Sequence, residues 1–244
     1  MAAIVLVHGA WHGAWCWNRV ERGLADQGLR TLVIELPGHG EDPGPLGDLH
    51  GDAMLVRQVI DGINEPVVLV GHSYGGAVIT EAGDHPAVRN LVYIAAFTLD
   101  TGESCMSAAV NLSGAAGISW EGHALLTEGF VSGPDKTITL APMVAAECLY
   151  NDCDADTIAW AIAHLGPHPL GNLQSVPRAV AWRTKPSTYV VCTHDLAMDP
   201  DLERTFARRC TSSVEWPTSH SPFLSRPELV SGLLGELATA SAQG

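Results

Sequence analysis

The sequence predicts one α/β domain on a doubly wound, mostly parallel sheet of about six strands, with an inserted helical cap. Two observations predict the sheet: the strand candidates are short apolar runs without polar alternation, and helix candidates lie between them. A third observation predicts the cap, because residues 98–186 hold no clear strand and are too many for a loop. With 46% hydrophobic residues, the 244-residue chain is able to bury such a core.

The core elements alternate along the chain. The strand candidates are Ile4–Val7, Thr31–Leu36, Val67–Val70, Leu91–Ala95, Tyr189–Cys192 and, more weakly, Val214–Trp216. The helix candidates are Asn18–Gln27, Leu49–Ile63, Tyr74–Gly83, Asp201–Arg209 and Pro222–Ala240. Such alternation is typical of parallel strands joined by helical crossovers. We therefore expect residues 1–97 and 187–244 to form the core.

The cap candidate, residues 98–186, differs in composition from the rest of the chain. It is rich in glycine, serine, alanine and proline, and its helix-like pieces are Ser119–Glu128, Pro142–Tyr150 and Asp154–Leu165. We expect these helices to cover one edge of the sheet.

Charge and cysteine content limit the classes of partner and the compartment that we expect for this protein. The formal net charge is −14, and no basic patch suited to nucleic acid is visible. No apolar run reaches the length of a membrane span. The chain opens into a strand candidate with no basic n-region or small-residue cleavage site, so we expect no signal peptide. The six cysteines form no CxxC pair and fit no common zinc spacing. We expect a cytoplasmic protein with reduced thiols, without nucleic-acid or membrane partners.

A serine lies at the junction of a strand and a helix. The stretch GHSYG, residues 71–75, fits the pattern G-x-S-x-G and separates the apolar run before it from the helix candidate at Tyr74. At such a sharp turn, larger residues two before and two after the serine would collide with neighbouring backbone. The turn exposes the hydroxyl above the sheet, at the positive end of the helix. This context predicts Ser73 as a nucleophile.

A serine nucleophile needs a base and an acid to orient the base, and in this architecture they follow in the order acid, then histidine. His220 lies in a turn-rich loop after the last strand candidate and is the expected base. Asp195 directly follows the preceding strand and its neighbour His194, and is the favoured acid. Four rival acids remain open: Asp199, Asp201, Asp100 and Glu103. His72 is expected to pack beside the nucleophile.

Two backbone amides are expected to hold the oxyanion of a tetrahedral intermediate. One is the N–H of Tyr74, directly after the nucleophile, and the other comes from the loop after the first strand, where we favour Ala10. His8 and His12 in this loop are not expected to bind metal, because glycines interrupt any helix there. The nearby tryptophans 11, 15 and 17 are candidates for lining an apolar pocket or for the core.

Taken together, these motifs resemble the α/β-hydrolase superfamily over nearly the whole chain. The chain is most similar to a small branch with plant methylesterases of the salicylate-binding type, hydroxynitrile lyases and related bacterial esterases. The match rests on Val5-Leu6-Val7-His8-Gly9-Ala10 with Trp15 and Trp17, Leu36-Pro37-Gly38-His39-Gly40, Gly71-His72-Ser73-Tyr74-Gly75-Gly76, Val191-Cys192-Thr193-His194-Asp195 and Ser219-His220-Ser221-Pro222-Phe223-Leu224. The resemblance implies a Ser73–Asp195–His220 triad, an oxyanion hole at Ala10 and Tyr74, and a cap.

Two departures bear on the branch. The chain starts at what would be the third strand of the full superfamily sheet, as in this small branch. One lyase group has a lysine after the catalytic histidine, where this chain has Ser221, and another has asparagine at the position of Gly9.

The absence of both lyase residues favours hydrolysis by a serine carboxylesterase, without cofactor or metal. A pocket walled by tryptophans and apolar cap residues would suit a small apolar or aromatic ester. A carbon–carbon lyase of the hydroxynitrile type, a non-catalytic ligand receptor, and amide or lactone hydrolysis are the alternatives. A homodimer is compatible with the sequence.

Overall fold

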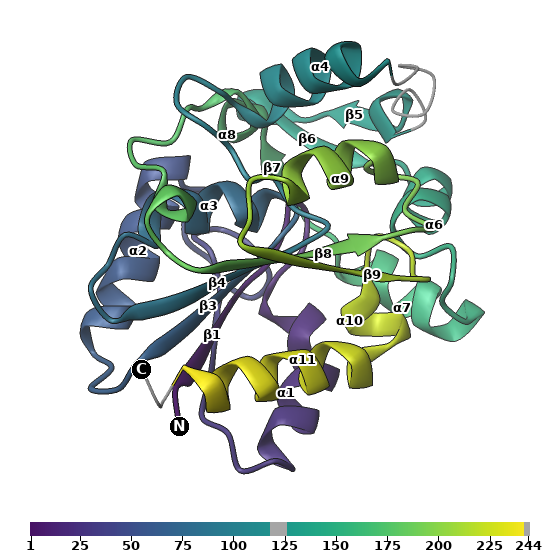
Figure 1. Ribbon diagram of the computed structural model, residues 1–244. Coiled ribbons are helices and arrows are strands. Elements are labelled where there is room, and N and C mark those ends of the chain that lie inside the picture. The colour runs from purple at the N-terminus through teal and green to yellow at the C-terminus, as the bar shows by residue number, and fades with distance from the viewer. Residues whose placement is uncertain (118–125, 242–244) are drawn as a thin grey trace.

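A six-stranded parallel sheet runs through the molecule in the computed structural model, which describes residues 1–117 and 126–241 (Figure 1). The spatial order of its strands is β2-β1-β3-β4-β8-β9, and every neighbouring pair is parallel. The strands are β1 (Ala3–Val7), β2 (Thr31–Ile34), β3 (Val67–His72), β4 (Val88–Ile94), β8 (Ser187–Cys192) and β9 (Ser212–Trp216). The predicted doubly wound parallel sheet is confirmed.

Helices cover both faces of this sheet. Along β1 and β3 every residue is buried, and successive side chains enter two different clusters: Val5 and Leu69 pack on one face, Leu6 and Val70 on the other. The first face is covered by α2 (Leu49–Asp61), α3 (Tyr74–Ala82) and α9 (Pro200–Ala207), and the second by η1 (Ala14–Trp17), α1 (Asn18–Ala25), α10 (Pro222–Ser225) and α11 (Pro227–Ala240).

The expected elements are present, with ends that differ by up to three residues. One expectation is wrong: Pro222–Ala240 is two helices, broken at Arg226, whose φ of −138° and ψ of 55° are not helical. A residue before proline is forced out of the helical region, so Pro227 ends α10 and starts α11.

The inserted segment, residues 98–186, is not purely helical, which corrects the expectation that it holds no strand. It contains an antiparallel sheet of β5 (Phe130–Ser132), β6 (Thr137–Leu140) and β7 (His168–Pro169). These strands have two to four residues each, too few for a clear alternation pattern. In Figure 1 these strands lie in the upper part of the view, above the strands of the main sheet.

The helices of this segment are α4 (Cys105–Ala116), α6 (Pro142–Leu149), α7 (Ala155–His164) and α8 (Leu170–Gln174), with short 3₁₀ turns η2 (Pro134–Lys136) and η3 (Ala181–Arg183). The expected helices Pro142–Tyr150 and Asp154–Leu165 are confirmed as α6 and α7, whereas Ser119–Glu128 falls mostly outside the described residues. Helix α4 was missed, although Ser104 and Ser107 form a capping box at its start.

All six cysteines are free thiols. In the described ranges, none of the helices combines the length and the apolar character that a membrane span requires.

Candidate active site

Ser73 sits on the sharp turn between β3 and α3. Its φ of +51° is rarely adopted by a residue with a side chain, so the surrounding backbone must hold it there. Gly71 and Gly75 permit this turn: a Cβ on Gly75 would lie 2.7 Å from the carbonyl oxygens of Val7 and His8, and one on Gly71 would overlap Gly75. The strand–turn–helix context expected from G-x-S-x-G is therefore present.

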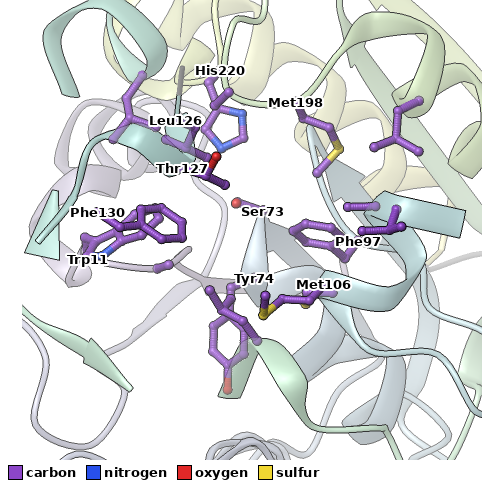
Figure 2. A pocket seen from close by; sticks show the side chains of 18 residues that line it. Trp11, Ser73, Tyr74, Phe97, Met106, Leu126, Thr127, Phe130, Met198 and His220 are labelled. Atoms are coloured by element: carbon purple, nitrogen blue, oxygen red, sulfur yellow. The ribbon is translucent and has the colours of Figure 1, made fainter. Parts of the chain in front are cut away.

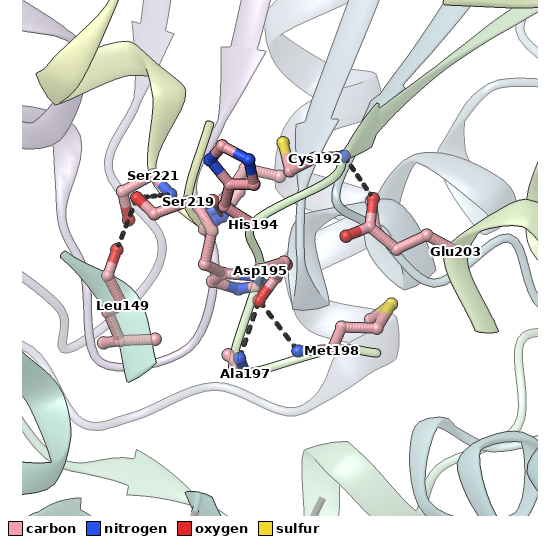
Figure 3. Close-up of polar contacts among 12 residues, drawn as sticks. Leu149, Cys192, His194, Asp195, Ala197, Met198, Glu203, Ser219 and Ser221 are labelled. Atoms are coloured by element: carbon pink, nitrogen blue, oxygen red, sulfur yellow. Dashed lines mark hydrogen bonds and ion pairs between the residues drawn. The ribbon is translucent and has the colours of Figure 1, made fainter. Parts of the chain in front are cut away.

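His220 and Asp195 form a buried pair. His220 follows β9 and Asp195 follows β8, and His220 Nδ1 lies 2.5 Å from Asp195 Oδ2. The other oxygen, Asp195 Oδ1, accepts the N–H groups of Ala197 at 2.6 Å and Met198 at 2.9 Å (Figure 3). A carboxylate fixed by these three donors holds the proton of His220 on Nδ1 and leaves Nε2 free to act as a base.

Ser73 and His220 line the same cavity from different elements (Figure 2). Among the described residues no hydrogen bond joins Ser73 Oγ to the His220 ring. Contacts of this kind are often long in an unliganded enzyme and shorten with substrate bound.

The rival acids are engaged elsewhere. Asp199 caps α9, and Asp201 pairs with Arg204 at 2.7 Å. Asp100 and Glu103 each lie 2.5 Å from an arginine, Arg183 and Arg209 respectively. Of the five candidate acids, Asp195 alone contacts His220 in the described part of the chain.

His72 supports the backbone of His220. Its Nε2–H donates to the His220 carbonyl at 3.0 Å, and the two rings meet edge to face with centroids 4.7 Å apart. Burial, together with His220 and His12, lowers the pKa of His72 well below 6.5, so its ring is neutral. His194, by contrast, is exposed at the surface.

The two expected oxyanion donors border the nucleophile. Tyr74 is the first residue of α3. The N–H groups in the first turn of a helix have no acceptor within that helix. Ala10 lines the cavity, and its neighbour Gly9 approaches Ser73 so closely that a Cβ there would lie 2.9 Å from Ser73 Cβ. The loop after β1 thus passes directly beside Ser73, as the expected role of Ala10 requires.

The cavity itself, of about 180 Å³, is almost wholly apolar. The described wall contains aromatic, methionine and leucine side chains, among them Trp11, Phe97, Met106, Leu126, Phe130 and Met198 (Figure 2). The titratable side chains in this described wall are His220, Cys105 and Tyr74. Of the three candidate tryptophans, Trp11 lines it, Trp17 is buried in the core and Trp15 borders a separate groove with Trp160.

His8 and His12 use both ring nitrogens within the protein. His8 Nδ1–H donates to the Gly9 carbonyl, and its Nε2 accepts the Leu36 N–H. Burial lowers the pKa of His8 to about 3 and that of His12 to about 4, so both rings are neutral. The described residues contain no group of three or more side chains placed to hold a metal ion.

A second buried acid, Glu203, lies behind Asp195 and was not predicted. Its Oε2 accepts the Cys192 N–H at 3.0 Å (Figure 3). Burial, and then the charge of Asp195, raises the pKa of Glu203 well above 4.5. Glu203 therefore favours its protonated form.

Glu203→Gln is expected to raise the Tm relative to wild type, and to raise it more at pH 8 than at pH 5. An acid with a raised folded-state pKa contributes stability below its unfolded pKa, near 4.5, and that stability is lost as pH rises toward the folded value. Glutamine imitates the protonated acid and has no proton to lose. Thermal unfolding at both pH values measures the effect.

The matched control is Glu215→Gln, on the surface, where Arg204 lowers the pKa of the glutamate. This control should show no gain at pH 8. An equal Tm difference between wild type and Glu203→Gln at both pH values would show that Glu203 is ionised in the folded protein.

Comparison with known proteins agrees with this architecture. The model of the alpha/beta hydrolase family matches residues 4–233. The carbendazim hydrolyzing esterase of Nocardioides sp. is 41% identical over 113 residues, covering 44% of this chain and 47% of that protein. Putative methylesterase 12 of Arabidopsis thaliana is 26% identical over 247 residues, covering 96% of this chain and 71% of that protein.

A solved structure extends the likeness to the whole fold. The pyrethroid hydrolase of Sphingobium faniae JZ-2 superposes with a TM-score of 0.85 over 100% of this chain and 99% of that one. At 20% identity, this likeness is one of fold.

Proposed function

The chain belongs to the alpha/beta hydrolase family, and we propose that it is a serine carboxylesterase that forms an acyl-enzyme on Ser73. The observation that carries the proposal is the apolar cavity that both Ser73 and His220 line, with His220 paired to the buried Asp195. Relatives named as a carbendazim hydrolyzing esterase and a putative methylesterase support ester hydrolysis.

The geometry supports the following sequence of steps. His220 Nε2 takes the proton of Ser73 Oγ as this oxygen attacks the ester carbonyl, and Asp195 stabilises the imidazolium. The amides of Ala10 and Tyr74 bind the oxyanion. His220 returns the proton to the leaving alcohol, then activates water, which attacks the acyl carbon and releases the acid and Ser73.

The cavity favours a neutral, apolar or aromatic ester. Among the described residues that line it there is no lysine or arginine, so a negatively charged acyl group would meet no counterion from them. Burying an unpaired carboxylate costs several kcal/mol. The small volume sets the size of the group that fits beside Ser73.

The experiment compares p-nitrophenyl butyrate with the p-nitrophenyl monoester of succinate, which differs by a terminal carboxylate. We expect kcat/KM to be at least about 100-fold higher for the neutral ester, because that charge loses its solvation in the cavity. Both activities should disappear in Ser73→Ala. Equal turnover of the two esters would contradict the proposed specificity, and wild-type-like turnover in Ser73→Ala would contradict the proposed function.

A further inference from the structure

One turn of the inserted segment contacts all three loops that carry Ala10, Asp195 and His220. The connection from α6 to α7 spans residues 150–154, and the turn is formed by its first three residues, Tyr150, Asn151 and Asp152. The Cys153 N–H closes it by donating to the Tyr150 carbonyl at 2.9 Å. Each of the three side chains reaches a different loop.

Asp152 holds the loop of His220. Its Oδ2 accepts the Ser219 N–H at 2.8 Å and the Ser225 hydroxyl at 2.9 Å, and its Oδ1 accepts the Ser219 hydroxyl. Ser219 Oγ also lies between the Leu149 carbonyl and the Ser221 N–H (Figure 3). Although Asp152 is exposed, it thus receives three donors from the residues on either side of the base.

Asn151 holds the loop of Asp195. Its Nδ2 donates to the His194 carbonyl at 3.1 Å, in the peptide unit that leads into Asp195. The same loop is joined to the loop of His220, because the His194 N–H donates to the Thr218 carbonyl at 3.0 Å. The acid and base loops are therefore bound to each other and to one turn.

Tyr150 reaches the loop of Ala10 through His12. The Ala10 carbonyl can only accept, so His12 Nδ1 carries the proton and donates to it at 2.8 Å. With a neutral ring, His12 Nε2 is then an acceptor, and the buried Tyr150 hydroxyl donates to it at 2.9 Å. One chain of two hydrogen bonds therefore links the inserted segment to the carbonyl of Ala10, the residue whose N–H is the expected oxyanion donor.

We propose that Tyr150, Asn151 and Asp152 are positioning residues. They hold the base, the acid and one oxyanion donor in fixed positions relative to one another around Ser73. This inference rests on the proposed function. Loops are the most mobile parts of a fold, and a misplacement of about 1 Å in catalytic geometry can cost about 100-fold in rate. The inserted segment therefore contributes to catalysis as well as to covering the cavity.

The main test compares Asp152→Ala with Asp154→Ala. Asp154 lies two residues away and caps α7 by accepting the Thr157 N–H at 2.7 Å, without contact to the three loops. We expect Asp154→Ala to lower Tm by about 2–4 °C and to keep kcat within about twofold. We expect Asp152→Ala to lower kcat for p-nitrophenyl butyrate by about 10–100-fold, with KM within about threefold.

Two milder variants keep the test decisive if Asp152→Ala does not fold. Asp152→Asn keeps one carbonyl acceptor, and Tyr150→Phe removes one hydroxyl without changing the packing of the ring. Each should lower kcat by about 3–30-fold at a temperature where the protein is fully folded, and each should slow inactivation by a p-nitrophenyl phosphonate to a similar extent.

The outcomes separate this inference from the proposed function. Wild-type turnover that is lost in Ser73→Ala supports the esterase whatever the turn variants do. In such an active enzyme, Asp152 and Tyr150 variants with the kcat of Asp154→Ala, or with losses that follow Tm alone, would overturn the positioning role.

Discussion

Replacing Ser73 with alanine is expected to lower kcat by about 10⁴–10⁶-fold, with the fold retained. The alanine removes one oxygen that faces the cavity and leaves the packing of the neighbouring glycines unchanged. Without this oxygen no acyl-enzyme forms, and only the oxyanion hole and binding remain to accelerate attack by water. Steady-state hydrolysis of p-nitrophenyl acetate at neutral pH measures the loss.

A matched control is Ser213→Ala, an exposed serine on β9. This variant should keep wild-type turnover and a circular dichroism spectrum identical to that of Ser73→Ala. A Ser73→Ala protein with more than about one hundredth of wild-type kcat would exclude Ser73 as the nucleophile.

Asp195→Asn is expected to lower kcat by about 10⁴-fold. In the wild type, one oxygen accepts two backbone N–H groups and the other accepts His220 Nδ1–H. The amide NH₂ of asparagine must replace one of these oxygens and will face a donor in either orientation. The favoured response is reversal of the His220 tautomer, which places a proton on Nε2 and removes the base.

Asp201→Asn provides the comparison, because Asp201 lies on the same segment and pairs with Arg204 at the surface. It should keep kcat within about twofold, since a surface ion pair contributes about 0–1 kcal/mol. If Asp195→Asn kept a tenth or more of wild-type kcat, or if Asp201→Asn lost as much as Asp195→Asn, the acid assignment would be wrong.

The sheet and the turn at Ser73 could be predicted because local sequence determines them. Strands buried on both faces have no polar alternation, and Gly71 and Gly75 are needed where backbone atoms leave no room for a Cβ. The small sheet β5–β7 could not be predicted, because its strands are too short for a periodic pattern. These strands pair only after the segment folds back on itself. The break before Pro227, by contrast, follows from a local rule, because a residue before proline avoids the helical conformation.

Choosing the acid required tertiary structure. Asp100 and Glu103 became unsuitable only when packing placed Arg183 and Arg209 against them. The contact of Asp152 with Ser219 also could not be predicted from the sequence. The two residues are 67 positions apart, and no local motif marks their contact. Chain order favours His220 as the base, because His194, the other histidine after residue 186, stands directly before Asp195, where the acid is expected.

The most direct test of Ser73 as the nucleophile is covalent labelling with a p-nitrophenyl alkylphosphonate, followed by intact mass and peptide mapping. The Ser73 oxygen attacks the phosphorus as it would attack an ester carbonyl, and p-nitrophenolate leaves. The phosphonate ester that forms on the serine resists hydrolysis. We expect release of one p-nitrophenol per protein, an adduct on the peptide that contains Ser73, and loss of ester turnover in proportion to labelling. An adduct on another residue, or full ester turnover by completely labelled protein, would contradict Ser73 as the nucleophile.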